Sequence, residues 1–209
     1  MFVRDYMVTK VVTIPPDASF NDAVKTMRIH GIRRLPVVEG GKLLGLVTES
    51  HFRELGAKEG SASYRYYLVS KEKVSHIMIK NVITVSPDTT IEECAALANE
   101  HSIGTFPVIE KGRIVGIMTS TDLFKILTGV LGFDKPGTRI RVIGDYEDRP
   151  LSKVPELVCQ HRVRIQSMFP IVTADGNRTD LILHLGIDDP QEISSDLEAR
   201  GYTLELRPH

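Results

Sequence analysis

A short run of hydroxylated and acidic residues, Thr119-Ser120-Thr121-Asp122, follows an apolar stretch and opens a helical pattern. Where a helix directly follows a strand, the free amides of its first turn and the positive end of the helix dipole form an anion site. A threonine hydroxyl there adds a hydrogen-bond donor for phosphate. A carboxylate one turn into the helix can accept hydrogen bonds from two vicinal hydroxyls. The run therefore suits a ribose phosphate. Thr119 and Asp122 also match a capping box, which stabilises a helix by about 1 kcal/mol, and the two roles are compatible.

Two adjacent arginines, Arg33 and Arg34, form a second group that could do chemistry. A guanidinium binds phosphate through two hydrogen bonds and stays charged at any working pH. The alternative is a solvated pair of loop residues. Whether this pair and the Thr119–Asp122 run can act together depends on the helices and strands that position them.

Those elements come from an internal repeat. Positions 3–52 align with positions 74–123 at an offset of 71 residues without a gap, and identical pairs such as Pro36 with Pro107 and Thr48 with Thr119 run along the alignment. Two copies of one supersecondary unit explain this pattern, and such units usually pack together because neither buries its apolar face alone. We expect a pseudo-twofold pair.

Each copy is predicted to be a β-α-β-β-α unit of about 55 residues. A Pro-Asp turn and a capping-box pair precede the first helix, which should end near His30 or His101. Gly41 and Gly112 suit the positive φ of a tight hairpin between the next two strands. The predicted strands span 11–14, 35–38 and 43–47 in the first copy and 82–85, 106–109 and 114–118 in the second.

The element order, the strands LPVV and FPVI, and the segments GLVTESH and GIMTSTD together resemble a tandem pair of CBS domains, also called a Bateman module, over roughly residues 1–130. The resemblance implies an α/β (α+β) fold in which Asp122 binds the ribose of an adenosine ligand. It also implies composite sites, each formed by both copies. The main site would then comprise Thr9, Ile32, Arg33, Arg34, Pro36, Thr119, Thr121 and Asp122.

The two sites are expected to differ. His51 stands in the first copy where Asp122 stands in the second, and an imidazole cannot chelate two hydroxyls as a carboxylate does. The two arginines have no basic counterpart in the second copy, so only the main site combines a ribose acceptor with phosphate donors. We expect one good nucleotide site. The weaker site would comprise Thr48, Ser50, Lys80, Ile103, Gly104, Thr105 and Pro107.

Residues 138–209 share no repeat with the front of the chain and follow a strand-helix-strand-strand-helix-strand pattern, which is the ferredoxin-like order. With YEDRP before the first helix and DLEARGY near the end, this part resembles an ACT domain, a family that binds amino acids at a dimer interface. Leu151 follows Asp148-Arg149-Pro150 where that family has glycine, which favours a role in pairing subunits or contacting a partner. A CBS pair followed by an ACT-like domain resembles the bacterial acetoin-utilisation regulatory family.

The composition argues against several other functions. Lysine and arginine total 26 against 27 acidic residues, and no segment is strongly charged, so neither a nucleic-acid nor a membrane partner is expected. The N-terminus lacks the apolar core of a signal peptide, which makes the cytoplasm the default location. There is no P-loop, G-x-S-x-G or H-E-x-x-H motif, so we expect neither catalysis nor a metal site. Cys94 and Cys159 sit in apolar helical patterns and should be core residues.

The predicted domains are CBS copies at 1–56 and 74–132, a linker at 57–73 and an ACT-like domain at 138–209. The leading interpretation is a non-enzymatic regulatory module, expected to be a homodimer, that senses AMP, ADP or ATP between its CBS copies and needs no other cofactor. The ACT-like domain or a protein partner would receive the signal. Three alternatives stay open: a dimerisation adaptor that binds no nucleotide, a sensor of S-adenosylmethionine or NAD, and a sensor of an amino acid at the ACT-like domain.

Overall fold

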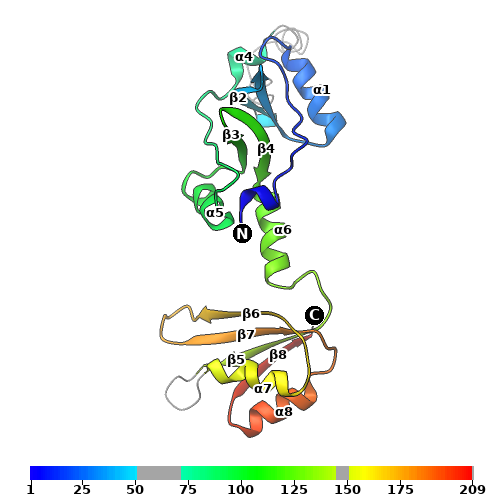
Figure 1. The fold of residues 1–209 in the computed structure, drawn as a ribbon, viewed down its shortest axis with the longest axis vertical. Helices are drawn as coiled ribbons and strands as arrows, with labels where there is room; N and C mark the ends of the chain where they lie inside the picture. Colours follow the sequence, from blue (N-terminus) through cyan, green and yellow to red (C-terminus); the bar gives the residue numbers. More distant parts are fainter. Residues whose placement is uncertain (51–71, 145–150, 209) are drawn as a thin grey trace, which may run out of the picture. The chain divides into compact units, whose positions relative to one another are not determined.

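The computed structural model describes residues 1–50, 72–144 and 151–208 (Figure 1). The chain divides into two compact units, Met1–Leu123 and Phe124–His209. The first unit contains most of both repeat copies. His51, residues 57–71 of the expected linker and Asp148-Arg149-Pro150 lie outside the described residues.

Each repeat copy contains the expected antiparallel hairpin of two strands. The turns need positive φ, and Gly41 (85°) and Gly112 (76°) supply it, as the sequence predicts. Both hairpins carry a register shift at equivalent positions, after Val37 and after Val108. The two copies therefore share this irregularity as well as their element order. The strands are β1 (Arg34–Glu39) with β2 (Lys42–Thr48), and β3 (Thr105–Glu110) with β4 (Arg113–Thr119).

The helices of the first unit begin at the predicted caps. The Ser19 hydroxyl accepts a hydrogen bond from the Asp22 amide at 3.1 Å, and Thr90 and Glu93 form a reciprocal capping box. The first helix ends at Gly31, which adopts the left-handed conformation. The elements are the 3-10 helix η1 (Val3–Asp5) and the helices α1 (Phe20–His30), α4 (Val74–Ile77), α5 (Ile91–Glu100) and α6 (Ser120–Val130).

The first predicted strand of each copy is wrong as a strand. Residues 11–14 and 82–85 each form a single parallel bridge, Ile14 with Val37 and Val85 with Val108. In the first copy, Ile14 donates to Pro36 and accepts from Val38. The ladder would continue through the N–H of the residue two positions on, and this residue is a proline without an N–H in both copies, Pro16 and Pro87. The β-branched composition suits extended backbone, and the prolines limit its pairing to one residue.

The segments that precede these bridges cross to the other copy. Val8 and Ile117 exchange two backbone hydrogen bonds of 3.0 Å, so the N-terminal segment of the chain pairs with β4 of the second copy. Ile79 and Leu46 exchange two bonds of 2.9 Å, so the segment that opens the second copy pairs with β2 of the first. The reciprocal crossing joins the two copies through main-chain bonds.

The cores of the copies lie between hairpin and helix. Phe20 and Leu35 are fully buried in the first copy, and Phe106 and Met118 are fully buried in the second. Cys94 is buried in the second copy, as expected. The expectation for Cys159 is wrong, because that residue is exposed on α7 (Val154–Gln160). Its helix is short, and Val154 and Val158 one turn apart supply the buried face instead.

The second unit is one four-stranded antiparallel sheet with the order β6-β7-β5-β8. Its two longer helices lie on the same face of the sheet (Figure 1). Leu183, Leu185, Ile193 and Leu197 are almost completely buried between helices and sheet. The elements are β5 (Thr138–Ile143), the 3-10 helix η2 (Leu151–Lys153), α7, β6 (Ile165–Val172), β7 (Thr179–Leu185), α8 (Gln191–Ala199) and β8 (Thr203–Pro208).

Candidate functional site

The Thr119–Asp122 run begins α6 and forms the predicted capping box. Oδ2 of Asp122 accepts hydrogen bonds from the Thr119 amide (2.9 Å) and hydroxyl (2.6 Å), and the Asp122 amide donates to the Thr119 hydroxyl at 3.3 Å. The other carboxylate oxygen, Oδ1, makes no hydrogen bond within the described residues. One carboxylate can therefore cap the helix through Oδ2 and offer Oδ1 to a ligand.

Arg34 crosses from the first copy to the start of this helix. Its Nη1 lies 3.5 Å from the carbonyl oxygen of Gly104, which also accepts from the Thr105 hydroxyl (2.7 Å) and the Ser120 amide (3.2 Å). A Cβ built on Gly104 would lie 3.0 Å from the Ser120 hydroxyl and 3.2 Å from Nη2 of Arg34. The guanidinium thus sits beside the first residue of α6, close to the site of helix-dipole positive charge.

We call Arg34, Gly104, Thr105, Thr119, Ser120 and Asp122 the seam cluster, because they meet where the two copies join. Arg34 is half-buried and makes no ion pair within the residues that the structure describes. A cation and a helix N-terminus side by side, without a carboxylate bound to the cation, favour an anion at this place.

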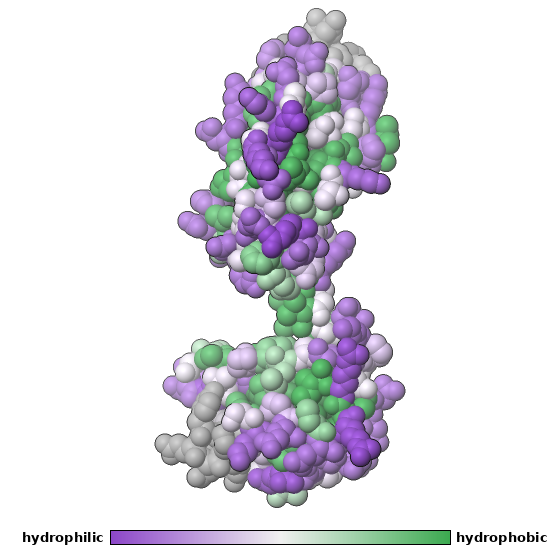
Figure 2. All heavy atoms as spheres, in the orientation of Figure 1, coloured by the Kyte–Doolittle hydropathy of each residue, from purple (hydrophilic) through white to green (hydrophobic). Residues whose placement is uncertain are grey.

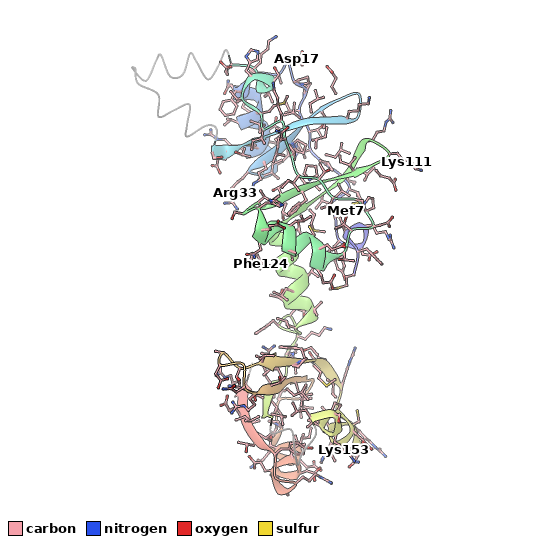
Figure 3. All side chains as sticks on the ribbon, turned by 90° about the vertical axis from the view of Figure 1, so that its left-hand side faces the viewer. Met7, Asp17, Arg33, Lys111, Phe124 and Lys153 are labelled. Atoms are coloured by element: carbon pink, nitrogen blue, oxygen red, sulfur yellow. The ribbon has the colours of Figure 1, made fainter. Side chains whose placement is uncertain are left out.

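Arg33 and Ile32 have a different environment. They line a cavity of about 290 Å³ on the first copy, together with Met27, Arg28 and Glu49. Arg33 is exposed at the edge of the first unit (Figure 3), and its carbonyl accepts a hydrogen bond from the Glu49 amide. Arg34 opens β1 and turns toward the seam, whereas Arg33 lies in the bend before this strand and lines the separate cavity.

The crossing segments carry Thr9 and Lys80 to the copies that the composite site requires. Thr9 follows Val8, which pairs with Ile117 of β4, and Lys80 follows Ile79, which pairs with Leu46 of β2. Both bridges are antiparallel, so the chain leaves each bridge in the direction away from Thr119 or Thr48. The segments agree with the expected composite sites, whereas Thr9 and Lys80 themselves lie past the level of the threonines.

The pre-proline residues pair within their own copies. Arg34 lies beside Thr48, and Thr105 lies beside Thr119, in the register of the two hairpins. Pro36 and Pro107 are buried partners of Leu46 and Ile117. Gly104 and Thr105, predicted in the weaker site, therefore adjoin Thr119, and Arg34 and Gly104 contact each other across the seam.

The rest of the weaker site is less well defined. The Thr48 and Ser50 hydroxyls lie 2.6 Å apart at the end of β2, and Ile103 donates its amide to Ala98 at the end of α5. Ser120, which sequence reasoning missed, contributes its amide to the seam. The signal was present in the sequence, because Ser120 is the first residue of the helix that the Thr-x-Thr-Asp run predicts. Thr121 is exposed beside it.

Two hairpin-and-helix copies joined through crossed segments define a tandem repeat module, and the chain belongs to the CBS-domain family. The family model of the CBS domain matches residues 3–58 and 74–129. The chain is 34% identical over 124 residues to inosine-5'-monophosphate dehydrogenase of Korarchaeum cryptofilum, a match that covers 58% of this chain and 23% of that enzyme. The chain thus spans about a quarter of that relative.

Solved structures resemble the CBS pair. A protein from Vibrio cholerae assigned to acetoin utilization (AcuB) superposes with a TM-score of 0.55 at 30% identity, covering 64% of this chain and 95% of that one. The CBS pair of protein MJ0100, in complex with 5'-methylthioadenosine and S-adenosyl-L-methionine, gives 0.54 at 28% identity, covering 62% and 97%. CBSX2 in complex with AMP shares the fold, with a TM-score of 0.53 at 21% identity over 64% and 98%.

Among the described residues, no helix is both long enough and apolar enough to cross a bilayer. The same part of the chain contains no group of three or more histidine, cysteine or acidic side chains arranged to hold a metal ion.

Proposed function

We propose that the seam cluster binds an adenine nucleotide, AMP, ADP or ATP, and that the chain is a regulatory module rather than an enzyme. The observation that carries this proposal is the position of Arg34. A half-buried guanidinium without an ion-pair partner in the described residues lies beside the N-terminus of α6, where Asp122 keeps Oδ1 available. Phosphate and ribose are the two chemical groups that match this pair.

Each residue has a distinct role in the proposed complex. Arg34 binds phosphate at the positive end of the α6 dipole, where the Ser120 and Asp122 amides already donate to Gly104 and Thr119. Asp122 accepts hydrogen bonds from the ribose hydroxyls through Oδ1 while Oδ2 remains on the cap. Thr121 borders this site. Thr9 lies past the level of Thr119, Ile32 lines the separate cavity beside Arg33, and Pro36 is buried against Leu46, so their part in the site stays a prediction. The weaker site, with Thr48, Ser50, Lys80 and Ile103, is proposed to have lower affinity for the same ligand.

Regulation would follow from a shift in population. The contact of Arg34 with the Gly104 carbonyl is long, at 3.5 Å, and a phosphate would offer the guanidinium a charged acceptor instead. Ligand binding would then favour one arrangement of the two copies over another. Affinity alone does not produce this shift, because a ligand moves an equilibrium only by its differential affinity for the two states.

S-adenosylmethionine is the second candidate ligand, since the related CBS pair of MJ0100 is a complex with this compound and with methylthioadenosine. These ligands carry no phosphate, and NAD carries a bridged diphosphate. Arg34 favours a phosphate-bearing ligand. A dimerisation adaptor without a ligand is the remaining alternative.

We also propose that the second unit is an ACT-like domain that receives the signal or contacts a protein partner. Its element order and sheet order support this proposal. A homodimer is supported by apolar surface along α6 (Figure 2), where Phe124, Leu127 and Val130 are about half exposed or more. The likeness to AcuB supports membership of the acetoin-utilisation regulatory family.

Titration calorimetry of the full chain with AMP, ADP, ATP, NAD and S-adenosylmethionine tests the proposal. We expect saturable binding of at least one of the three mononucleotides, and weaker binding of S-adenosylmethionine. Tighter binding of S-adenosylmethionine would reverse the assignment of the ligand. If none of the five compounds binds, the dimerisation adaptor would remain as the function.

A further inference from the structure

The second unit has a hollow on the face of its sheet that its helices leave uncovered. Ile140 and Val142 of β5 belong to the core beneath α7 and α8, so the alternating residues Arg139 and Arg141 point to the opposite face. They line a cavity of about 410 Å³, a volume within the usual range for small-molecule sites. Arg207 of β8 lies opposite Arg139 in the register and lines the same cavity.

The charges in this hollow are not balanced. Arg141 is fully engaged as an ion pair, because Nε and Nη2 donate to Asp180 at 2.8 and 2.5 Å and Nη1 donates to Glu205 at 3.0 Å. Arg207 makes no ion pair within the described residues, and neither does Arg139. Two of the three arginines that line the cavity thus have no carboxylate partner in the described residues, and this charge favours an anion.

Arg139 is held in place by neutral groups. Nη2 donates to the Leu131 carbonyl at 3.1 Å, and the guanidinium stacks on the Phe133 ring at 3.8 Å from its centroid. Nε is buried and has no hydrogen-bond partner among the residues that the structure describes. Burial lowers the pKa of Arg139, and no carboxylate pairs with its charge within the described residues. An anion in the hollow would supply that compensation.

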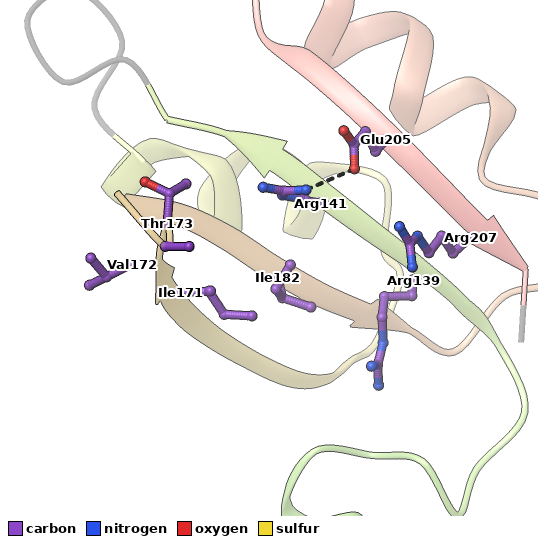
Figure 4. Close-up of a pocket in the computed structure, with 9 residues that line it drawn as sticks. Arg139, Arg141, Ile171, Val172, Thr173, Ile182, Glu205 and Arg207 are labelled. Carbon is purple, nitrogen blue, oxygen red and sulfur yellow. Dashed lines mark hydrogen bonds and ion pairs between the residues drawn. The ribbon is translucent and has the colours of Figure 1, made fainter. Parts of the chain in front are cut away.

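The other end of the hollow is apolar. Ile171, Val172 and Ile182 line it, and Figure 4 shows Val172 at the end away from Arg139 and Arg207. Ile182 is buried, whereas Val172 is 63% exposed, so the apolar floor reaches solvent. A ligand that fits both ends carries a negative group at one end and a hydrocarbon part at the other.

We propose that this hollow, the arginine hollow, binds a small organic anion with an apolar tail. The negative group would lie between Arg139 and Arg207, and the tail would cover Ile182 and Val172. A second copy of the chain is a poorer occupant in a twofold pair, since it would bring the same unbalanced arginines against themselves. The hollow lies in the second unit, and its occupancy does not depend on nucleotide binding at the seam cluster.

Hexanoate, 1-hexanol and hexylammonium form a matched set of probes for this site. We titrate each into the 15N-labelled full chain and follow the amide and arginine Nε signals. Hexanoate should shift the signals of Arg139, Arg207 and Val172 in a saturable manner, with an affinity about fivefold higher than that of hexanol. Equal affinity for hexanoate and hexanol would overturn the proposal, and so would the absence of saturable shifts on this face.

Two surface variants test the two ends of the hollow. Arg207→Gln should weaken hexanoate about threefold and leave hexanol unchanged, and Val172→Asp should weaken both probes. Arg164→Gln removes an exposed arginine that does not line the hollow and should change neither. If Arg207→Gln and Arg164→Gln have the same effect, general charge explains binding and the proposal fails. Shifts on this face that follow protein concentration instead of hexanoate would assign it to a second copy and also refute the proposal.

Discussion

The Nη1 atom of Arg34 lies 3.5 Å from the carbonyl oxygen of Gly104, so one side chain of the first CBS copy reaches the backbone of the second. The same carbonyl accepts the amide of Ser120, the first residue of α6. A change in the charge around Arg34 should therefore alter the electrostatic potential at the first turn of the helix that carries Asp122.

Arg34→Gln should lower the affinity for AMP about tenfold and leave the affinity for adenosine nearly unchanged, because the lost charge-assisted contact is to phosphate. Titration calorimetry with both ligands measures the difference. Arg33→Gln is the matched control, since Arg33 lines a different cavity and should change AMP affinity less than twofold. Equal losses for AMP and adenosine in Arg34→Gln would mean that this guanidinium does not touch phosphate.

Asp122→Ala should remove ribose binding and part of the helix cap together. We expect about tenfold weaker AMP binding and about 1 kcal/mol lower stability, while Asp122→Glu should retain part of the affinity. Ser19→Ala separates the two effects, because Ser19 caps α1 in the same way but lies outside the seam cluster. That control should lose similar stability in urea unfolding and keep AMP affinity. If Asp122→Ala leaves the affinity for AMP unchanged, the only role of Asp122 is to cap the helix.

Gly45→Ala tests the crossed segments. A Cβ at Gly45 would lie 2.6 Å from the backbone oxygen of Ile79, and backbone cannot move aside as a side chain can. We expect a loss of about 2 kcal/mol in the free energy of unfolding. Gly116→Ala meets mainly the flexible end of Met7 and should cost less.

Gly129→Ala is the control for the glycine series, because an added Cβ there meets open space within α6. It should raise stability by roughly 0.5–1 kcal/mol, since alanine favours the helix more than glycine does. Urea unfolding of the three glycine variants measures the order of their free energies of unfolding. Equal effects of Gly45→Ala and Gly129→Ala would show that the crossing is not tightly packed.

Much of the fold could be predicted because its signals are local. Ser19, Thr90 and Gly41 specify caps and a turn through interactions with residues a few positions away. The repeat adds to this, since a correct assignment in one copy supports the same assignment in the other. The strand at 11–14 failed because pairing depends on the partner strand and on Pro16, and β-branched composition reports neither.

The site could be predicted only in part because it depends on which side of the chain faces the seam. The sequence shows Arg33 and Arg34 as equivalents, and only the start of β1 at Arg34 decides which one crosses to Gly104. The resemblance places Thr105 in the weaker site, which stays a prediction, and the hairpin register sets Thr105 beside Thr119 as it sets Arg34 beside Thr48. Register is a long-range property, and a short motif does not encode it.

The two thiols should differ sharply in reactivity. Burial raises the pKa of Cys94 to about 11, whereas Cys159 is exposed on α7. Because the thiolate is the reactive form, a disulfide reagent at pH 8 should modify one thiol rapidly in the folded chain and the second only in denaturant. Cys159→Ser should abolish the rapid phase. Two rapid thiols would contradict the burial of Cys94.

The acid stability of the second unit should depend on Asp180. Burial opposes ionisation of this carboxyl, but hydrogen bonds from the Gly144 amide, Arg178 and Arg141 more than offset it and hold its pKa below the usual value. A carboxyl with a depressed folded-state pKa stabilises the fold above its unfolded pKa of about 4, and this stabilisation is lost as the pH falls through the folded value.

Asp180→Asn should therefore destabilise the second unit at pH 7 by about 3 kcal/mol, because two arginines lose their shared carboxylate, and the difference from the parent chain should shrink as the pH falls below about 4. Urea unfolding followed through the NMR signals of β5 and β7 measures this difference at each pH. Asp134→Asn is the control, because Asp134 is exposed and makes no hydrogen bond within the described residues. A difference for Asp180→Asn that stays constant from pH 7 to pH 2 would show that its effect is one of packing rather than charge.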